Sequence, residues 1–231
     1  MSNILLIETA TKVCSVGLAQ GNKIIALRED KSLQYSHSSL LTSFIDEVLR
    51  EAAIGFKNLD AVAVSMGPGS YTGLRIGVSV AKGLCYALDI PLIAINTLQS
   101  LAATAVQPGF VNADFFVPMI DARRMEVYNA VYDKSLNEIR ETSAEIIDEN
   151  AFTQLLEKGK VAFFGDGAPK CRAVISHTNA FFYDDIHPGV NGLLNFALEK
   201  FIQKQFEDLA YFEPFYLKDF VAGKPKVKGL H

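Results

Sequence analysis

Short apolar runs separated by polar turns occupy the first part of the chain, and longer amphipathic stretches follow them. Apolar runs of four to seven residues predict β-strands, whereas apolar residues spaced three and four apart predict helices. In chain order we predict strands at 4–7, 13–19 and 24–27, a helix at 39–52, a strand at 61–66, a helix at 71–88, a strand at 91–95 and a helix at 98–105 capped by Thr97.

A similar order of elements recurs in the second part of the chain. An acid follows the first strand of each part, Glu8 after Ile7 and Asp121 after Ile120. The order β-β-β-α-β-α-β-α is typical of a ribonuclease-H-like half, and two such halves predict the duplicated α/β fold of the actin-like ATPases (ASKHA). In that fold each of two lobes has a mixed sheet flanked by helices. We predict strands at 117–121, 126–133 and 138–147, a helix at 151–158, a strand at 161–164 and a helix at 192–205, with lobes at 1–108 and 109–231 and a junction near 105–112.

The first two predicted helices are apolar over a wider arc than packing on one sheet requires. In the helix at 39–52 the apolar side chains cover about 180° of the surface, and in the helix at 71–88 the polar ones fall within about 80°. Gly73 and Gly77 line one side of the second helix and allow a neighbouring backbone to approach closely. Two interpretations stay open: both helices are deeply buried, or one edge of each contacts a second protein.

Two predicted turns stand where actin-like kinases hold phosphate with acid, glycine and hydroxyl groups. The turn at 8–12 keeps Glu8, Thr9 and Thr11 but has no glycine, and the turn at 121–124 places two arginines after Asp121. These residues either are remnants of a nucleotide site or organise the turns. The Gly-rich turn at 67–73 opens a helix and is either a tight turn or an anion site, but it lacks the Lys-Ser/Thr pair of a Walker loop.

Composition argues against several classes of protein. With 49% hydrophobic residues in 231 the chain has enough apolar surface for a buried core, and its net charge of -4 lacks the basic balance of a nucleic-acid binder. We therefore expect any nucleic-acid role to run through a partner. The three cysteines predict free thiols, and the four histidines form no metal-binding motif. The N-terminus has neither signal-peptide nor membrane-span character, which predicts a cytoplasmic protein.

Six sequence blocks carry a resemblance that covers essentially the whole chain. They are LIETAT at 6–11, YSHS at 35–38, SMGPGSYTGLRIG at 65–77, IDARRMEVY at 120–128, GDGA at 165–168 and EPFYL at 213–217. Together they resemble the TsaB (YeaZ) family, and the block at 65–77 is highly specific for it.

The resemblance implies a non-catalytic scaffold subunit of the bacterial complex that makes threonylcarbamoyladenosine beside the anticodon of ANN-decoding tRNAs. Such a subunit binds and activates its paralogue, the transferase TsaD, while TsaC makes threonylcarbamoyl-adenylate and the ATPase TsaE joins the assembly. It implies that tRNA is met indirectly, that ATP and metal belong to the partner subunits, and that the chain binds no cofactor. In the paralogue a metal-binding HxxxH motif follows the fifth strand. Asn96 and Ser100 stand at the matching positions, so the resemblance implies that the metal site is lost.

The resemblance also implies that the first two helices form the interface with TsaD, and that the chain forms a homodimer through the same surface when alone. The interface residues that we expect are His37, Leu40, Leu41, Phe44, Ile45, Val48, Tyr71, Leu74, Arg75, Val78 and Lys82. Two other readings remain. The chain is an independent actin-like-fold enzyme, either a small-molecule kinase or a metallopeptidase, or it is a nucleotide-sensing homodimer.

Overall fold

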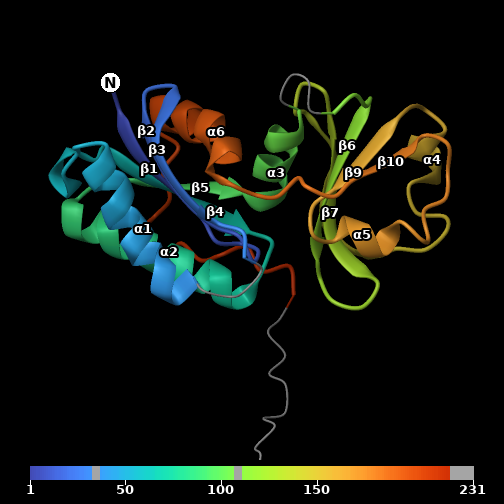
Figure 1. Ribbon diagram of the computed structural model, residues 1–231, viewed down its shortest axis with the longest axis horizontal. Helices are drawn as coiled ribbons and strands as arrows, with labels where there is room; N and C mark the ends of the chain where they lie inside the picture. Colours follow the sequence, from blue (N-terminus) through green and yellow to red (C-terminus); the bar gives the residue numbers. More distant parts are fainter. Residues whose placement is uncertain (33–36, 107–110, 219–231) are drawn as a thin grey trace, which may run out of the picture.

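The computed structural model describes residues 1–32, 37–106 and 111–218, which form two lobes, each built on a five-stranded mixed sheet (Figure 1). In the first sheet the strands lie in the order β3-β2-β1-β4-β5. β1 pairs antiparallel with β2, and β2 with β3, whereas β1, β4 and β5 run parallel. The strands are β1 Asn3–Glu8, β2 Cys14–Gln20, β3 Lys23–Asp30, β4 Ala61–Gly67 and β5 Leu92–Asn96.

The second sheet repeats this arrangement. Its order β10-β9-β6-β7-β8 is the first order read from the other edge, again with an antiparallel meander beside parallel strands. The strands are β6 Phe115–Asp121, β7 Glu126–Asp133, β8 Glu138–Ile146, β9 Val161–Phe164 and β10 Ala180–Tyr183. The predicted duplicated actin-like fold is therefore confirmed.

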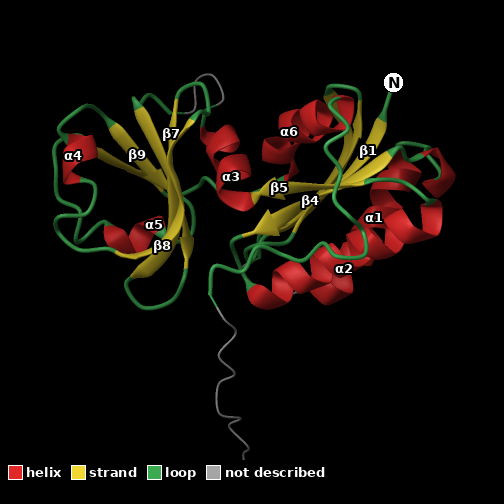
Figure 2. Ribbon diagram, turned by 180° about the vertical axis from the view of Figure 1, so that it is seen from behind, coloured by secondary structure: helices red, strands yellow, loops and turns green. Residues whose placement is uncertain are grey.

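Helices cover both faces of the first sheet (Figure 2). α1 (His37–Glu51) and α2 (Tyr71–Leu88) lie side by side on one face, with η1 (Phe56–Asn58) in the loop after α1. α6 (Val190–Ile202) lies on the other face, where it packs against α3 (Thr97–Ala105), and α3 also contacts β6 and β7 of the second sheet. In the second lobe, α4 (Thr153–Leu156) and α5 (Ala168–Cys171) are single turns. No helix among the described residues is long and apolar enough to cross a membrane.

The end of the described chain returns to the first lobe, which corrects the predicted lobe of 109–231. On α6, Val190, Leu193 and Ala197 are buried against the apolar residues of β1, β4 and β5. The C-terminal segment (206–218) then crosses the first lobe, where the amide of Glu207 donates to Leu92 O at 2.9 Å and that of Phe215 to Met66 O at 2.7 Å. Periodicity predicts that a helix is amphipathic but not which sheet it covers, so this return was not foreseen.

Several element boundaries also differ from the prediction. Asn96, not Thr97, caps α3, because its side-chain oxygen accepts from the amides of Leu98 and Gln99. The helix predicted at 151–158 is the single turn Thr153–Leu156, and it begins after Phe152, whose backbone is left-handed with φ of 65°. The helix predicted at 192–205 runs from Val190 to Ile202, and Lys204 (φ 54°) adopts the left-handed conformation just after it. α5 and β10 were not predicted, because elements of four residues have no readable periodicity.

Candidate functional site

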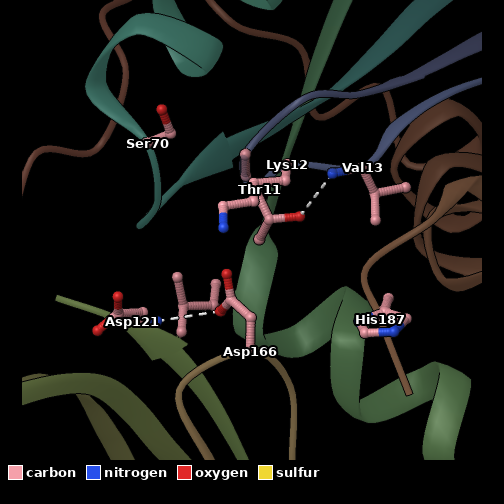
Figure 3. A pocket seen from close by; sticks show the side chains of 9 residues that line it. Thr11, Lys12, Val13, Ser70, Asp121, Asp166 and His187 are labelled. Carbon is pink, nitrogen blue, oxygen red and sulfur yellow. Dashed lines mark hydrogen bonds between the residues drawn. The ribbon is translucent and has the colours of Figure 1, made fainter. Parts of the chain in front are cut away.

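The carboxyl ends of β1 and β6 meet across a cleft between the two lobes, where the two acid-containing hairpins face each other (Figure 3). A cavity of about 160 Å³ lies between them. It is smaller than the roughly 300–1,000 Å³ of typical small-molecule sites. Its lining consists of Ala10, Thr11, Lys12, Val13 and Ser70 from the first lobe with Ile120, Asp121, Asp166 and His187.

Glu8 at the end of β1 is fully buried and does not line this cavity. Its Oε1 accepts a hydrogen bond from the amide of Ala10 at 2.7 Å and another from Ser65 Oγ at 2.7 Å. Its Oε2 has no hydrogen-bond partner among the residues that the structure describes. Burial raises the pKa of Glu8 from 4.5 to about 7, and hydrogen bonding to the carboxylate opposes this rise only in part. Glu8 therefore organises the first turn from inside the lobe.

The first hairpin packs tightly against the start of α2. Thr9 Oγ1 donates to the carbonyl of Gly73 at 2.9 Å, and a Cβ at Gly77 would lie 2.2 Å from the same Oγ1. A Cβ at Gly69 would lie 2.3 Å from the carbonyl oxygen of Ala10. The glycines of this region thus allow the chain's own hairpin to approach α2, and the Thr9 hydroxyl is used in that contact.

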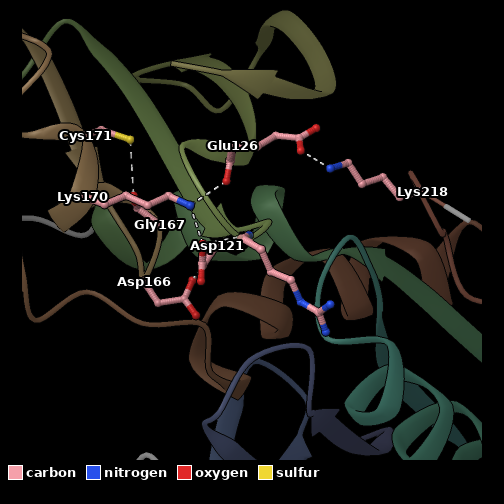
Figure 4. A network of polar contacts seen from close by, with 8 residues as sticks. Asp121, Glu126, Asp166, Gly167, Lys170, Cys171 and Lys218 are labelled. Carbon is pink, nitrogen blue, oxygen red and sulfur yellow. Dashed lines mark hydrogen bonds and ion pairs between the residues drawn. The ribbon is translucent and has the colours of Figure 1, made fainter. Parts of the chain in front are cut away.

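The second hairpin is held by a polar network (Figure 4). The amide of Asp121 donates to Asp166 Oδ1 at 3.0 Å, while Asp121 Oδ1 accepts from the amide of Arg123 and pairs with Lys170. Lys218, in the C-terminal segment, pairs with Glu126. Although Asp166 reaches solvent, the protein around it desolvates the carboxyl and raises its pKa above the usual range. Asp121 therefore organises the second turn, as Glu8 does the first.

Asn96 and Ser100, the positions that match the paralogue's metal ligands, lie at the N-cap and in the interior of α3. Asn96 caps α3 with its side-chain oxygen and donates from Nδ2 to Thr142 Oγ1 of the second lobe at 3.0 Å. Ser100 is buried inside α3, and its carbonyl lies where a Cβ at Gly192 would be 2.1 Å away. In the described part of the chain no group of three His, Cys, Asp or Glu side chains is arranged to hold a metal ion.

Five of the expected interface residues lie in the core of the first lobe. Leu41, Ile45, Val48, Leu74 and Val78 have at most 4% of their surface exposed, and all but Leu74 belong to the apolar cluster that includes residues of β1, β2 and β4. Because α1 and α2 cover one whole face of the sheet and also contact each other, much of their apolar arc is buried within the lobe. These five side chains are corrected to core residues and are not available to a second protein in this structure.

Three more expected residues lie along the edge of α2 that the C-terminal segment follows. The ring of Tyr71 lies 5.0 Å from that of Tyr216, and Arg75 donates to the Tyr71 hydroxyl at 3.1 Å. Lys82 Nζ donates to the carbonyl of Phe212 at 2.9 Å. This edge is therefore covered by the chain itself. α1 begins at His37, whose side chain lies outside the described residues.

The outward side of α2, which we call the helical face, keeps accessible apolar surface. The two expected residues Leu40 and Phe44 are half-buried on α1, where they pack against the core of the first lobe. On the helical face of α2, Ile76 and Val80 are half-buried and Gly83 and Tyr86 are exposed, with 83% of the Tyr86 surface in solvent. The prediction missed these four α2 residues, and the signal that could have found them is their position opposite the buried stripe of Gly73, Leu74, Gly77, Val78, Ala81 and Cys85.

Comparisons with known proteins indicate the same family that the six sequence blocks resemble. A family model described as "TsaD: tRNA N6-adenosine threonylcarbamoyltransferase" matches residues 31–226. The tRNA threonylcarbamoyladenosine biosynthesis protein TsaB of Haemophilus influenzae is 30% identical over 231 residues, covering 96% of this chain and 95% of that protein. The protein of the same name from Escherichia coli is 29% identical, with 96% of each chain covered. A Pseudomonas aeruginosa structure described as similar to peptidase YEAZ has a TM-score of 0.83 at 25% identity, covering 94% of this chain and 100% of that one.

Proposed function

Since this chain belongs to the TsaB (YeaZ) family, we propose that it is a subunit of the bacterial machinery that makes threonylcarbamoyladenosine beside the anticodon of ANN-decoding tRNAs. Its role there is to bind a paralogous TsaD-like transferase and hold it in an active form. The names of the relatives support the process.

The observation that carries the scaffold role is the helical face. The half-buried aliphatic side chains of Ile76 and Val80 line it, and Tyr86 stands almost fully in solvent. Exposed aromatic residues of this kind are enriched among the residues that contribute most to protein–protein binding. Ser79 and Gly83 are small and exposed, so a helix of a second protein can approach α2 closely. This combination fits a helix-on-helix interface with a sister subunit.

The cleft supports a role without catalysis. Glu8 and Asp121 are engaged in their own turns, the Thr9 hydroxyl bonds to α2, and the cavity of about 160 Å³ does not hold a nucleotide as it stands. ATP and metal then belong to the partner subunits. A small-molecule kinase or metallopeptidase remains the alternative, and ATP turnover or a stoichiometric bound metal in the isolated chain would favour it.

The decisive variant is Gly83→Arg. Within the described structure no atom lies within 4 Å of a Cβ at this position, and arginine is a better helix former than glycine by about 0.8 kcal/mol. The variant should therefore fold at least as well as the wild type while placing a long charged side chain on the helical face. We expect it to lose binding to the TsaD-like partner and, with it, transfer to tRNA in a reconstituted reaction.

The matched control is Asn195→Arg, which adds the same side chain to an exposed position of α6 on the opposite face of the sheet. It should bind the partner like the wild type. Unchanged partner binding by Gly83→Arg would remove the helical face from the proposal. Undiminished tRNA modification in the complete absence of this chain would end the scaffold role altogether.

The proposal extends to further partners. A TsaE-like ATPase joins the assembly, a TsaC-like synthase supplies the activated threonylcarbamoyl group, and a homodimer forms through the same face when the partner is missing. Since tRNA modification of this kind takes place in the cytoplasm, we expect the chain there.

A further inference from the structure

Two arginines, Arg123 and Arg124, stand at the tip of the β6–β7 hairpin, where only the backbone of Arg123 takes part in the polar network of the turn. Arg123 and Arg124 have φ angles of 71° and 52°, in the left-handed region that residues with a Cβ rarely adopt. Both are exposed, and neither side chain forms an ion pair or hydrogen bond with any residue that the structure describes. The hairpin thus holds two successive guanidinium groups in solvent at a turn whose backbone disfavours arginine.

The acids at the base of this hairpin do not compensate these charges. Asp121 pairs with Lys170, and Glu126 pairs with Lys218, as Figure 4 shows. Lys12 lines the cleft from the first lobe, and Asp166 lines the same cavity from the second. Positive charge is therefore in excess at the hairpin tip, although the chain as a whole has a net charge of -4.

The position of the arginines favours a ligand outside the cleft over one within it. The cavity beneath the hairpin holds only about 160 Å³, and two of its lining residues are the acids Asp121 and Asp166. A nucleotide or another compact anion would meet those carboxylates and too little space. An extended polyanion that runs past the mouth of the cleft meets neither obstacle.

We propose that the tip of the β6–β7 hairpin, with Arg123 and Arg124 as its cations and Lys12 beside it, binds the phosphodiester backbone of the tRNA that the complex modifies. This inference rests on the proposed function and adds to it a direct contact between this chain and RNA. Arginine is suited to the contact because its guanidinium presents paired donors to phosphate oxygens. Such contacts carry no base specificity, so the hairpin positions the tRNA and does not select it.

The test uses the heterodimer of the full chain with its TsaD-like partner and an unmodified tRNA transcript. The variant is Arg123→Asn with Arg124→Gly, because asparagine and glycine adopt the left-handed backbone more readily than arginine and the turn is retained. We expect tRNA affinity to fall about tenfold at low salt. The slope of log affinity against log salt should become shallower by about 1.5, as expected for two lost phosphate contacts.

The control, Lys23→Ala with Lys57→Ala, removes the same charge at the far end of the first sheet and should leave tRNA affinity unchanged. Equal tRNA affinity in the hairpin variant and the wild type overturns the inference, as does an equal loss in the control. If the hairpin variant no longer binds inorganic phosphate or ATP but still binds tRNA, the arginines bind a small anion instead and the inference is overturned. A hairpin variant that no longer binds the partner assigns them to a protein contact.

The two proposals fail in different ways. If the wild-type heterodimer forms and modifies tRNA while the hairpin variant keeps its tRNA affinity, only this inference is lost. If the chain neither binds the partner nor supports modification, the proposed function is lost and the RNA contact with it. A third variant has Lys224, Lys226 and Lys228 changed to alanine. If this variant loses tRNA affinity while the hairpin variant keeps it, the contact belongs to the C-terminal tail and the inference is overturned.

Discussion

Substituting Glu8 with glutamine should change how the stability of this protein depends on pH. Glu8 is fully buried, and burial raises its pKa from 4.5 to about 7. In the unfolded chain the carboxyl ionises near pH 4.5, whereas in the folded protein it keeps its proton until about pH 7. The folded state therefore binds more protons between these values, and stability falls as pH rises through that window.

The size of this effect follows from the difference between the two pKa values. Ionising Glu8 costs the folded state about 3 kcal/mol more than the unfolded state, and this cost is complete above about pH 8. The oxygen Oε2 has no partner within the described residues that would offset the cost. Glutamine has nearly the same shape, accepts from Ala10 and Ser65 through its carbonyl oxygen, and carries no charge at any pH.

Urea denaturation of the wild type and Glu8→Gln at several pH values between 5 and 8 measures the effect. The wild type should lose stability toward pH 8 relative to the variant, so that the difference between them grows by about 1–3 kcal/mol over the range. Other titrating groups contribute equally to both proteins and cancel in the difference. A difference that stays constant with pH, or that shrinks as pH rises, would refute the assignment of Glu8 as a buried carboxyl held neutral by desolvation.

Two further substitutions test the packing that positions the cleft. Gly77→Ala should destabilise the protein by about 2 kcal/mol in urea denaturation, because the new Cβ would lie 2.2 Å from Thr9 Oγ1. Gly83→Ala on the same helix should instead stabilise the protein by up to about 1 kcal/mol, because no atom within the described structure lies within 4 Å of that Cβ. Equal effects at the two glycines would contradict the contact between Gly77 and Thr9. Asn96→Ala should destabilise the protein by about 1 kcal/mol through loss of the α3 cap. The control Asn195→Ala, at an exposed position of α6, should change stability by less than about 0.5 kcal/mol. A neutral Asn96→Ala would argue against the cap.

The sequence predicted the elements of the first lobe well, since strands and helices there are long enough for their periodicity to be read. The first helix is displaced by two residues at its start, and α2 runs from Tyr71 to Leu88 as predicted. The short elements of the second lobe were missed because four residues span about one helical turn or one strand segment. The repeated order of strands nevertheless predicted the duplicated fold correctly.

The C-terminal region lay beyond the reach of sequence patterns for a different reason. The polar residues of α6 predict an exposed side, but the partner of its apolar side is fixed by contacts far away in the chain, such as Val190 against Gly17. The same holds for the segment at 206–218, whose amides pair with Leu92 and Met66. Contacts of this range depend on the assembled first sheet and leave no local signal.

The width of an apolar arc is therefore weak evidence for a partner, and this protein shows why. α2 contacts the sheet below it, α1 along one edge, the first hairpin near its start and the C-terminal segment along the other edge, so four neighbours within the chain contact its inner side and both of its edges. The stronger evidence is the helical face, where Tyr86 and Gly83 are exposed although other residues of α2 already form its contact with the core. An exposed aromatic residue beside an open glycine contributes little to the fold of a single chain. A second protein that packs on the helical face would give both residues a role. The charged side chain of Gly83→Arg would then abolish the binding of that protein without harming the fold.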